Sequence, residues 1–454
     1  MEQRRNDEGK ATLFASGARL LPLAALMASP FFPSVLFAQD QQEVEAEQKF
    51  GGGPWTRPKL TGGWCGARDS LAAHGWTMDL DATYTFQVVA GGGWKGAAFE
   101  AFSNEDDRGH TLSGDLKIEL DTGKAGLWQG GRFNARLEGR RGRSVLQRAG
   151  CVSAVNNDAL FPNVVDRFDE GAAALTELSF TQSVGGKVAL FAGLLNPAEG
   201  DENEIAGSAL SNGSFLNSAL LYSLVEDATV PNVSLGGGLT IEAGATVSGS
   251  FSVFGSAETA GRNPFHAWHG TTFSTEWTVG HTLAERPGAQ TFGILYGINA
   301  DRADIAADPR ILLGSVLQGR PLPTSAADTW AFYYNVHQFL SGDAKGGWGV
   351  FARAGVSDGN PNPVRWNAAL GVGGVGTFPG RPEDRWGLGA FYLDLSNEAL
   401  LKGLRVGNEV GGDLYYLFTL TPWFRLTLDA QVIDSALPGR DPAWVLGLRT
   451  QFIF

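Results

Sequence analysis

The last twelve residues of the chain, AWVLGLRTQFIF at 443–454, decide the fold class. Their even-numbered positions are mostly apolar, from Trp444 to Phe454, whereas Arg449 and Gln451 stand at odd-numbered positions. A period of two is the pattern of a β-strand, because successive side chains of a strand point to opposite faces. The stretch therefore predicts a strand with one apolar face and one polar face.

The composition of the whole chain agrees with β-structure. Among its 454 residues there are 62 glycines, 13 tryptophans and 28 phenylalanines. Glycine and aromatic residues are typical of closed β-architectures, which need tight turns and aromatic interfaces. The net charge of −13 argues against nucleic acid as a partner, because phosphate binding needs a basic face. Cys65 and Cys151 match no metal-binding spacing and no Cys-x-x-Cys motif, so we predict neither a metal site nor a cofactor.

The N-terminus has the pattern of a secretory signal peptide. Arg19 precedes the apolar run LLPLAALMASPFFPSVLFA at 20–38, and the polar QDQQ follows it. The prolines within this run disfavour the alternative of a transmembrane helix. We therefore expect cleavage of residues 1–38 near Ala38, and a flexible N-terminus of the exported protein over 39–59. Beyond that point no stretch approaches the roughly twenty apolar residues that a membrane helix needs.

Period-two patterning continues through most of the chain. It is clear in DLKIELD at 115–121, in RFNARLEGR at 132–140 and in WFRLTLDAQ at 423–431. In each segment apolar residues alternate with charged or polar ones. We count about sixteen such segments, an even number within the range of outer-membrane β-barrels.

The connections between these segments alternate in length. Short ones such as SVGGK and LTPW alternate with long ones at 88–110, 142–172, 196–231, 255–270, 301–327 and 396–408. Short turns at one end and long loops at the other are expected of a transmembrane barrel, with the short turns in the periplasm. A soluble sandwich does not sort its loops in this way. We therefore predict an all-β fold, a transmembrane antiparallel β-barrel over 77–454, with a short periplasmic helix before the first strand, within 60–76.

Several longer motifs stand out along the chain. They are LTGGWCGARDSLAAHGWTMDLDATYT at 60–85, GSFLNSAL at 213–220, GVFARAGVSDGNPNPVRW at 349–366, PGRPEDRWGLGAFY at 379–392 and the C-terminal AWVLGLRTQFIF. Together they resemble the carbohydrate-selective porins of OprB type from Gram-negative outer membranes. The resemblance implies a barrel of about sixteen strands through which sugars diffuse passively and selectively.

The chemistry of a sugar explains why the resemblance also implies a lumen narrowed by arginine and carboxylate side chains. A sugar is uncharged and covered with hydroxyl groups, so its passage needs donors and acceptors that replace its water. Arginine supplies planar donors and carboxylates supply acceptors, while charges of both signs reject strongly charged solutes. We therefore expect the polar faces of the strands to carry the pore-lining residues.

Ten residues on these polar faces or in the N-terminal helix are the candidates for lining the pore or contacting the solute. They are Arg132, Arg136, Glu138, Arg140, Glu177, Arg353, Asp413, Arg425, Asp429 and Arg68. The first four share one face of one strand, and a structural ladder that stiffens the wall explains them equally well. The late-strand residues, from Arg353 to Asp429, fit the wall better than a constriction. Arg68 fits either the barrel mouth or an ion pair with Asp69 or with the wall.

Three further features leave alternatives open. The acidic stretch NPAEGDENEIAG at 196–207 fits a solvated extracellular loop better than an inward eyelet or a divalent-cation site, because it lacks the fixed spacing of a calcium loop. His266 and His269 share one long loop but have no third metal ligand beside them. Cys65 and Cys151 belong to opposite ends of the predicted barrel, which argues against a disulfide between them.

These features favour a sugar-permeable porin over other classes. An outer-membrane enzyme needs a nucleophile and a base, and none of the 6 histidines lies in a Gly-x-Ser-x-Gly or similar motif. A general small-solute pore and a non-conducting barrel that binds surface polysaccharide remain open, since both suit a polar lining. The expected partners are carbohydrate solutes, outer-membrane lipid and lipopolysaccharide, and the barrel-assembly machinery, whose recognition signal the terminal Phe454 resembles. No nucleic acid is expected, and a homo-oligomer remains open.

Overall fold

The computed structural model describes most of the chain beyond the expected signal peptide. The described residues are 50–94, 106–161, 171–197, 200–266, 269–298, 302–307, 324–325 and 328–454. The expected signal peptide at 1–38 lies outside these ranges. So does the expected flexible N-terminus up to residue 49.

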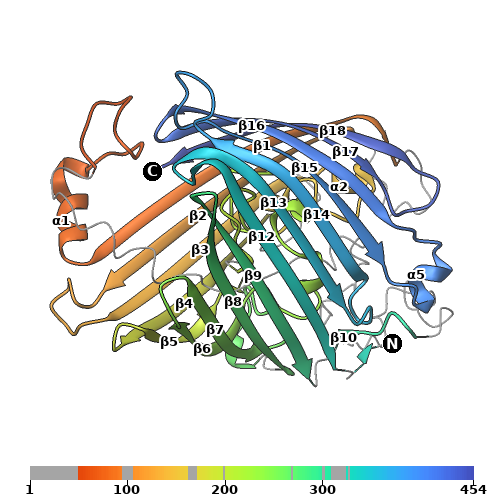
Figure 1. The fold of residues 1–454 in the computed structure, drawn as a ribbon, viewed down its shortest axis with the longest axis horizontal. Helices are drawn as coiled ribbons and strands as arrows, with labels where there is room; N and C mark the ends of the chain where they lie inside the picture. Colours follow the sequence, from red (N-terminus) through yellow and green to blue (C-terminus); the bar gives the residue numbers. More distant parts are fainter. Residues whose placement is uncertain are drawn as a thin grey trace, which may run out of the picture.

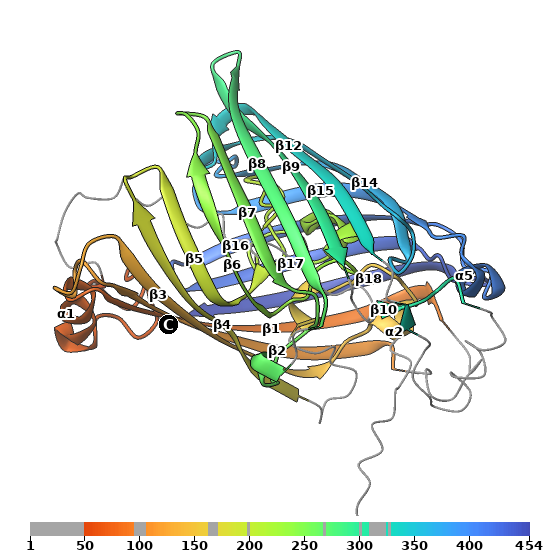
Figure 2. The same ribbon diagram turned by 90° about the horizontal axis from the view of Figure 1, so that it is seen from below.

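Sixteen strands of the described residues close into one antiparallel barrel (Figures 1 and 2). The strands of this ring are β1 Trp76–Gly93, β2 Arg108–Asp121, β3 Gly131–Arg143, β4 Gly171–Val184, β5 Val188–Leu195, β6 Ser234–Glu242, β7 Val247–Gly255, β8 Thr271–Leu283, β9 Arg286–Ile298, β12 Thr329–Asp343, β13 Gly346–Ser357, β14 Val364–Val375, β15 Arg385–Leu395, β16 Glu409–Thr421, β17 Phe424–Asp434 and β18 Asp441–Ile453. Each pairs with its neighbours in the chain, and β1 pairs with β18 to close the ring. The predicted antiparallel barrel is confirmed.

The remaining elements are short. Two strands of two residues each, β10 Arg302–Ala303 and β11 Thr324–Ser325, form a separate sheet. The helices are η2 Trp64–Gly66, α1 Ala67–Ala73, α2 Leu146–Ala149, η4 Asn157–Ala159, α3 Ser218–Leu221, η6 Leu224–Glu226, η7 Pro264–His266 and α5 Ala399–Gly403. Among the described residues, no helix combines the length and the apolar character needed to cross a bilayer.

The two faces of the strands differ as the sequence predicts. In β18, Trp444 and Leu446 lie on the outside and expose 57% and 46% of their surface. Arg449, on the other face, is 2% exposed, and its Nη2 donates to the Ser214 carbonyl oxygen (2.7 Å) of a loop inside the ring. A wall with an apolar outer face and a polar inner face suits hydrocarbon outside and water inside.

The short turns and the long loops lie at opposite ends of the barrel. Figure 1 shows α1 and the C-terminus at one end and α5 at the other. Turns of two or three residues, such as 185–187 and 344–345, lie at the α1 end, where β1 begins and β18 ends. The long connections, including 144–170 and 196–233, leave the other end. The rule for bacterial outer-membrane barrels assigns the end with short turns to the periplasm, so we call the α1 end the periplasmic end.

The helix expected before the first strand is confirmed. It lies beside the junction of β1 and β18, which we call the seam of the barrel. Arg68 of α1 is 3% exposed, and its Nη2 donates to the carbonyl oxygens of Met78 (2.5 Å) and Phe454 (3.1 Å). Its guanidinium also lies 4.5 Å from the ring centroid of Phe50. Burial lowers the pKa of Arg68 from its ordinary value, although the nearby carboxylates of Asp79 and then Asp69 act in the opposite direction. Arg68 therefore joins the N-terminal segment to both closing strands.

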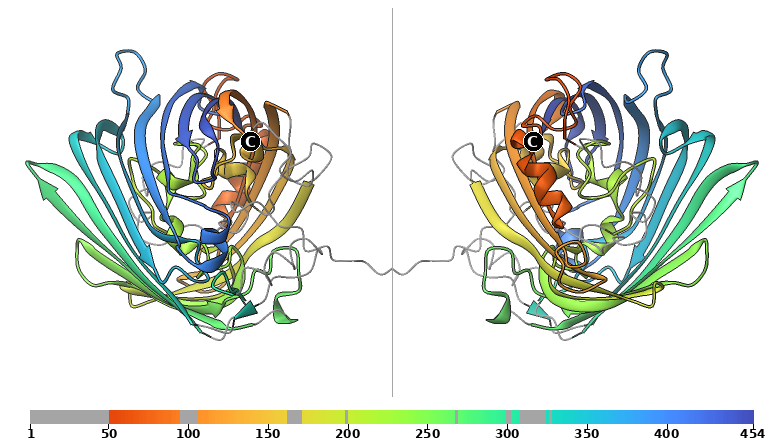
Figure 3. Two further views of the ribbon diagram at one scale, coloured as in Figure 1. Left: turned by 90° about the vertical axis from the view of Figure 1, so that its right-hand side faces the viewer. Right: turned by 90° about the vertical axis from the view of Figure 1, so that its left-hand side faces the viewer.

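Two long loops fold into the ring instead of away from it (Figure 3). Their described parts are 144–161, after β3, and 196–197 and 200–233, after β5, and most of these residues are buried. The apolar side chains of these loops that join the core include Val145, Leu146, Val152, Val155, Phe215, Leu220, Leu221, Leu224 and Val225. They form one cluster with Phe351, Phe391, Tyr415 and Leu417 of the wall. The apolar core therefore lies inside the ring, between the loops and the late strands.

Candidate functional site

Four charged side chains of β2 and β3 meet on the inner face of the wall. Asp115 lies opposite Glu138 in the strand register, and Arg136 and Arg140 are on the same face because they are two residues from Glu138. Arg136 Nη2 lies 3.0 Å from Glu138 Oε1 and 3.6 Å from Asp115 Oδ1. Arg140 Nη1 lies 3.2 Å from Asp115 Oδ1, and its Nη2 lies 3.4 Å from Glu138 Oε1. We call these four residues the β2–β3 charged cluster.

The loop after β3 adds a third carboxylate to this cluster. Arg140 Nε donates to the Asp158 carbonyl oxygen (2.5 Å), and Arg140 Nη2 lies 3.5 Å from Asp158 Oδ1. Ser113 Oγ donates to the other carboxylate oxygen of Asp158. Asn156 Nδ2 donates to Thr111 Oγ1 (3.0 Å), so the loop is held against β2. Two guanidiniums and three carboxylates thus share one stretch of wall.

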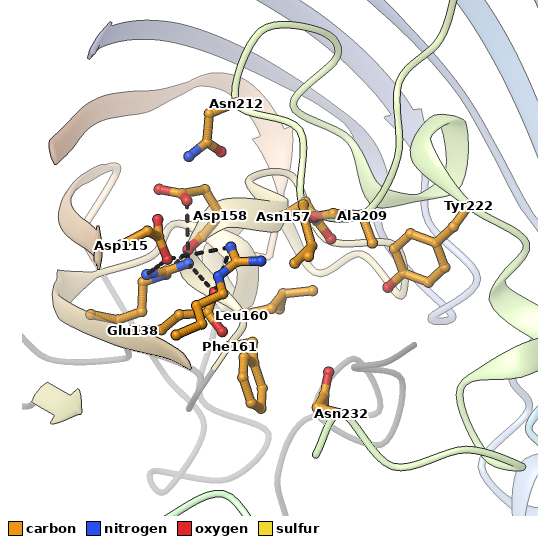
Figure 4. Close-up of a pocket in the computed structure, with 13 residues that line it drawn as sticks. Asp115, Glu138, Asn157, Asp158, Leu160, Phe161, Ala209, Asn212, Tyr222 and Asn232 are labelled. Atoms are coloured by element: carbon orange, nitrogen blue, oxygen red, sulfur yellow. Dashed lines mark hydrogen bonds and ion pairs between the residues drawn. The ribbon is translucent and has the colours of Figure 1, made fainter. Parts of the chain in front are cut away.

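A cavity opens onto this cluster (Figure 4). Its lining residues are Asp115, Arg136, Glu138, Arg140, Asn157, Asp158, Leu160, Phe161, Ala209, Leu210, Asn212, Tyr222 and Asn232. Figure 4 shows Asp115 and Glu138 on one side and Tyr222, from the loop after β5, across the cavity from them. The lining combines charged and amide groups with the apolar side chains of Leu160 and Phe161. Such a lining offers hydrogen bonds to hydroxyl groups and contact area to the apolar face of a ring.

Arg353 of β13 fastens the loop after β5 to the wall. It forms an ion pair with Asp201, and it donates to the carbonyl oxygens of Asp201 (2.7 Å) and Gly207 (2.9 Å). Both charged side chains are 0% exposed. The backbone N–H of Ser223 donates to Asp201 Oδ2 (2.9 Å), and Asn335 Nδ2 donates to the carbonyl oxygen of Glu202 (2.9 Å). Arg353 is therefore covered by the loop, and it is not among the residues that line the cavity.

Asp413 of β16 fastens a second part of the same loop. Its Oδ2 accepts hydrogen bonds from the backbone N–H groups of Leu216 (3.1 Å) and Asn217 (2.9 Å). The ring of Phe215, the preceding residue, packs edge-on against Tyr415 of the wall, with 4.9 Å between centroids. The GSFLNSAL motif is therefore docked on the inner wall by a carboxylate and an aromatic pair.

The other early-strand candidates lie beside the cluster. Arg132 Nε lies 3.4 Å from Glu119 Oε1, nearer to the periplasmic end of the same face. Glu177 of β4 lies opposite Arg136 in the register and accepts a hydrogen bond from Ser179 Oγ (2.6 Å). Neither residue is among those that line the cavity.

The three remaining candidates lie away from the cavity. Asp429 Oδ1 accepts a hydrogen bond from Gln431 Nε2 (2.9 Å) on the inner face of β17. Arg425 of the same strand is half-buried and makes no ion pair within the described part of the chain. Arg68 lies at the periplasmic seam, where it contacts the wall and not the lumen cavity. Of the ten candidates, the structure thus gathers Arg136, Glu138 and Arg140 at one cavity.

The preferred interpretation of 196–207 as a solvated extracellular loop is wrong for most of its described residues, although the side chains of Glu202 and Glu204 are exposed. Asp201 and Ala206 are fully buried, because the segment runs inside the barrel against Arg353 and its neighbours. Asn203 Nδ2 donates to Asn335 Oδ1 (2.6 Å) of the inner wall.

One histidine of the wall and the two cysteines are placed as follows. His337, on the inner face of β12, has its Nε2 3.6 Å from Glu204 Oε2 of the inward loop. Cys65 is exposed and Cys151 is buried, and both are free thiols. Within the described ranges, no three histidine, cysteine or acidic side chains are arranged to hold a metal ion.

The lining residues that sequence reasoning missed include Asp115, Asp158 and Tyr222. Asp115 was visible on the polar face of its segment, and aligning 115–121 with 132–140 as a hairpin would have placed it opposite Glu138. Asp158 and Tyr222 come from the inward loops, where no period-two pattern marks a lumen-facing side chain. Only the folded position of those loops identifies them.

Comparisons with known proteins agree with this architecture. Residues 110–454 match the family model described as "Carbohydrate-selective porin, OprB family". The high-pH structure of Pseudomonas putida OprB is similar with a TM-score of 0.72 and 20% sequence identity, over 88% of this chain and 99% of that chain. The low-pH structure of the same porin is similar with a TM-score of 0.53 and 17% identity over the same shares. No curated protein matches the sequence significantly.

Proposed function

Because this chain belongs to the OprB family of carbohydrate-selective porins, we propose that it conducts mono- or small oligosaccharides passively past the β2–β3 charged cluster. The family and the fold are those of channels in bacterial outer membranes. The observation that carries the proposal for the substrate is the cavity at this cluster, where Arg136 and Arg140 lie among three carboxylates.

The arrangement of these charges suits a neutral, hydroxylated solute. Each guanidinium keeps a carboxylate within 3.6 Å, so its charge is largely balanced by its neighbours. A strongly anionic or cationic solute gains little electrostatic attraction from a wall whose charges are balanced, and it loses its own hydration there. A hydroxyl group, in contrast, can donate to a carboxylate and accept from a guanidinium at the same time. The wall therefore favours sugars over ions of similar size.

The inward loops supply the size limit in this proposal. The loops at 144–161 and 200–233 occupy the lumen beside the late strands and leave the cavity at β2 and β3. A sixteen-stranded barrel without such loops has room for a wide aqueous channel. We expect solutes larger than small oligosaccharides to be retained at this level.

A liposome-swelling series tests the proposal. Purified protein is reconstituted, and swelling is measured for a monosaccharide, a disaccharide, a larger oligosaccharide and a carboxylate anion matched in size to the monosaccharide. We expect swelling to fall with sugar size and to be slower for the anion than for the monosaccharide. No swelling with any monosaccharide would refute the porin proposal and favour the alternative of a non-conducting barrel that binds polysaccharide. Equal swelling with the sugar and the anion would reduce the protein to a general small-solute pore.

Several parts of this proposal concern the route to the membrane. We propose that residues 1–38 direct export and are removed, and that the mature protein resides in the outer membrane of a Gram-negative bacterium. The terminal Phe454 is proposed as the recognition signal for the barrel-assembly machinery. Its backbone N–H donates to the Leu80 carbonyl oxygen (2.8 Å), so the signal becomes part of the closed wall after assembly.

A further inference from the structure

Four basic side chains stand on the outer face of the barrel near its extracellular end. They are Arg108 and His110 of β2 and Arg141 and Arg143 of β3, and we call them the basic outer patch. In the register, Arg141 lies opposite Leu112 and Arg143 lies opposite His110. Leu112 is an outward-facing apolar residue with 51% of its surface exposed, so its partner Arg141 shares the membrane-facing side.

The height of the patch can be estimated from the strand geometry. The ring of Phe133 in β3 packs against the ring of Phe180 in a tilted arrangement, with 4.7 Å between centroids, and belongs to the aromatic group near the periplasmic end. Each strand residue advances about 3.3 Å, which at a tilt of about 40° is about 2.5 Å across the membrane. Arg141 and Arg143, 8 and 10 residues beyond Phe133 in β3, therefore lie about 20 and 25 Å above it. Because the apolar band of such barrels is about 25 Å tall, the patch lies at the outer boundary between hydrocarbon and headgroups.

Only some of these basic side chains form an ion pair or a hydrogen bond with a described residue of the chain. Arg143 forms an ion pair with Asp106, and the ring of His110 shares a hydrogen bond with Tyr84 Oη (2.5 Å). Arg108 and Arg141 are exposed, and neither forms a hydrogen bond or an ion pair with any described residue. A guanidinium at the edge of hydrocarbon needs an anionic or strongly polar partner, and no described residue supplies one to Arg108 or Arg141.

The rest of the extracellular rim differs from this patch. In the described strands, the outer ends of β12, β14 and β18 carry Trp330, Trp366 and Trp444, which are typical of a membrane interface. Arg365, near the outer end of β14, is already paired with Asp394 (2.5 Å). Among the described strands, the exposed guanidiniums without a partner at this end therefore lie on β2 and β3.

We propose that the basic outer patch binds the phosphate groups of an anionic glycolipid of the lipopolysaccharide class in the outer leaflet. Guanidinium groups bind phosphate through parallel, charge-assisted hydrogen bonds, and two exposed arginines on neighbouring strands offer two such forks. The aliphatic stems and the adjoining Leu112 and Tyr84 offer apolar contact to the acyl chains below. This inference concerns the lipid-facing surface, so it does not depend on which solute the lumen conducts.

Binding of lipid A to the detergent-solubilised barrel tests the proposal. Native mass spectrometry gives apparent dissociation constants for bisphosphorylated lipid A and for its dephosphorylated form. The double variant R108Q/R141Q is expected to bind the bisphosphorylated form about 25-fold more weakly, from about fivefold for each basic side chain at an anionic lipid surface. R108Q alone is expected to weaken binding about fivefold. R262Q, which removes an exposed arginine from the loop after β7, is the matched control and is expected to bind as the wild type does.

The outcomes separate the proposal from its alternatives. Equal binding by wild type and R108Q/R141Q would overturn it, as would equal loss in R262Q, because net charge alone would then explain the affinity. Equal binding of the dephosphorylated lipid would show that phosphate is not recognised. Displacement by an equal concentration of inorganic phosphate would reassign the patch to free phosphate. The circular dichroism spectrum and the single-channel ion conductance of each variant are compared with those of the wild type to confirm that the barrel is intact. The single variant serves if the double variant fails to fold.

Discussion

Removing Arg353 should release the loop at 200–233 from the wall while the barrel stays closed. In Arg353→Met the two hydrogen bonds to the Asp201 and Gly207 carbonyl oxygens are lost, and the fully buried Asp201 carboxylate keeps no counter-charge. Breaking a buried pair in this way costs about 3–5 kcal/mol, because an uncompensated charge remains. Even 3 kcal/mol corresponds to roughly a hundredfold larger population of the undocked loop. The strand pairing around Arg353 does not depend on its side chain, so the wall itself should persist.

Hydrogen exchange of the loop measures this effect directly. Amides of 200–207 are expected to exchange about a hundredfold faster in Arg353→Met than in wild type, whereas amides of the strands keep their protection. Arg385→Met, which removes an exposed arginine at the start of β15, is the matched control. Adding Asp201→Asn to Arg353→Met should restore part of the protection, because no unpaired charge is then buried. A change below tenfold in Arg353→Met would refute the reasoning that this pair holds the loop.

Three further perturbations test other parts of the structure. Replacing Arg136 and Glu138 together with alanine should raise single-channel conductance and reduce the ratio of monosaccharide to anion flux in swelling assays. The reason is that the lumen becomes wider at this point and the wall loses its mixed charge. Unchanged conductance and flux ratio would make the role of the pair purely structural. Burial, and then the carboxylates around it, raises the pKa of Glu226 well above its ordinary value, so the folded state favours the neutral acid. The contribution of Glu226 to stability is complete below the ordinary carboxyl pKa range and is lost as pH rises through the raised pKa. Glu226→Gln should therefore gain thermal stability relative to wild type as pH increases from 5 to 9. A difference in unfolding temperature that stays constant over this pH range would contradict this. Arg68→Met should lower the unfolding temperature in detergent, since the loss of its hydrogen bonds is expected to cost about 1–3 kcal/mol. Proteolysis near α1 should also become faster. An identical unfolding temperature would show that Arg68 does not stabilise the junction of β1 and β18.

The wall of the barrel was predictable from local pattern alone. Arg136, Glu138 and Arg140 alternate with Ala135, Leu137 and their neighbours, and a strand between lipid and water imposes that period on its sequence. The same argument places Arg449 on the inner face, which the structure confirms. The lengths of the turns and loops then predict which end faces the periplasm.

The contents of the lumen were not predictable in this way. Asp201 and Arg353 are 152 residues apart, and Leu216 and Asp413 are 197 apart. Such pairs follow from where an irregular loop comes to rest, and no periodicity records it. For the same reason, the sequence identified Arg353 and Asp413 as inner-wall residues but did not predict that they bind the loop after β5.

The loop between β5 and β6 also has a mechanical role. It leaves the wall at one side of the ring and is fastened to β13 by Arg353 and to β16 by Asp413. It therefore acts as a brace across the cross-section. A barrel braced in this way resists flattening, because any change in its roundness must stretch or break buried polar contacts. Lateral pressure from the surrounding membrane would then be carried by the brace, and the cavity beside β2 and β3 would keep its dimensions.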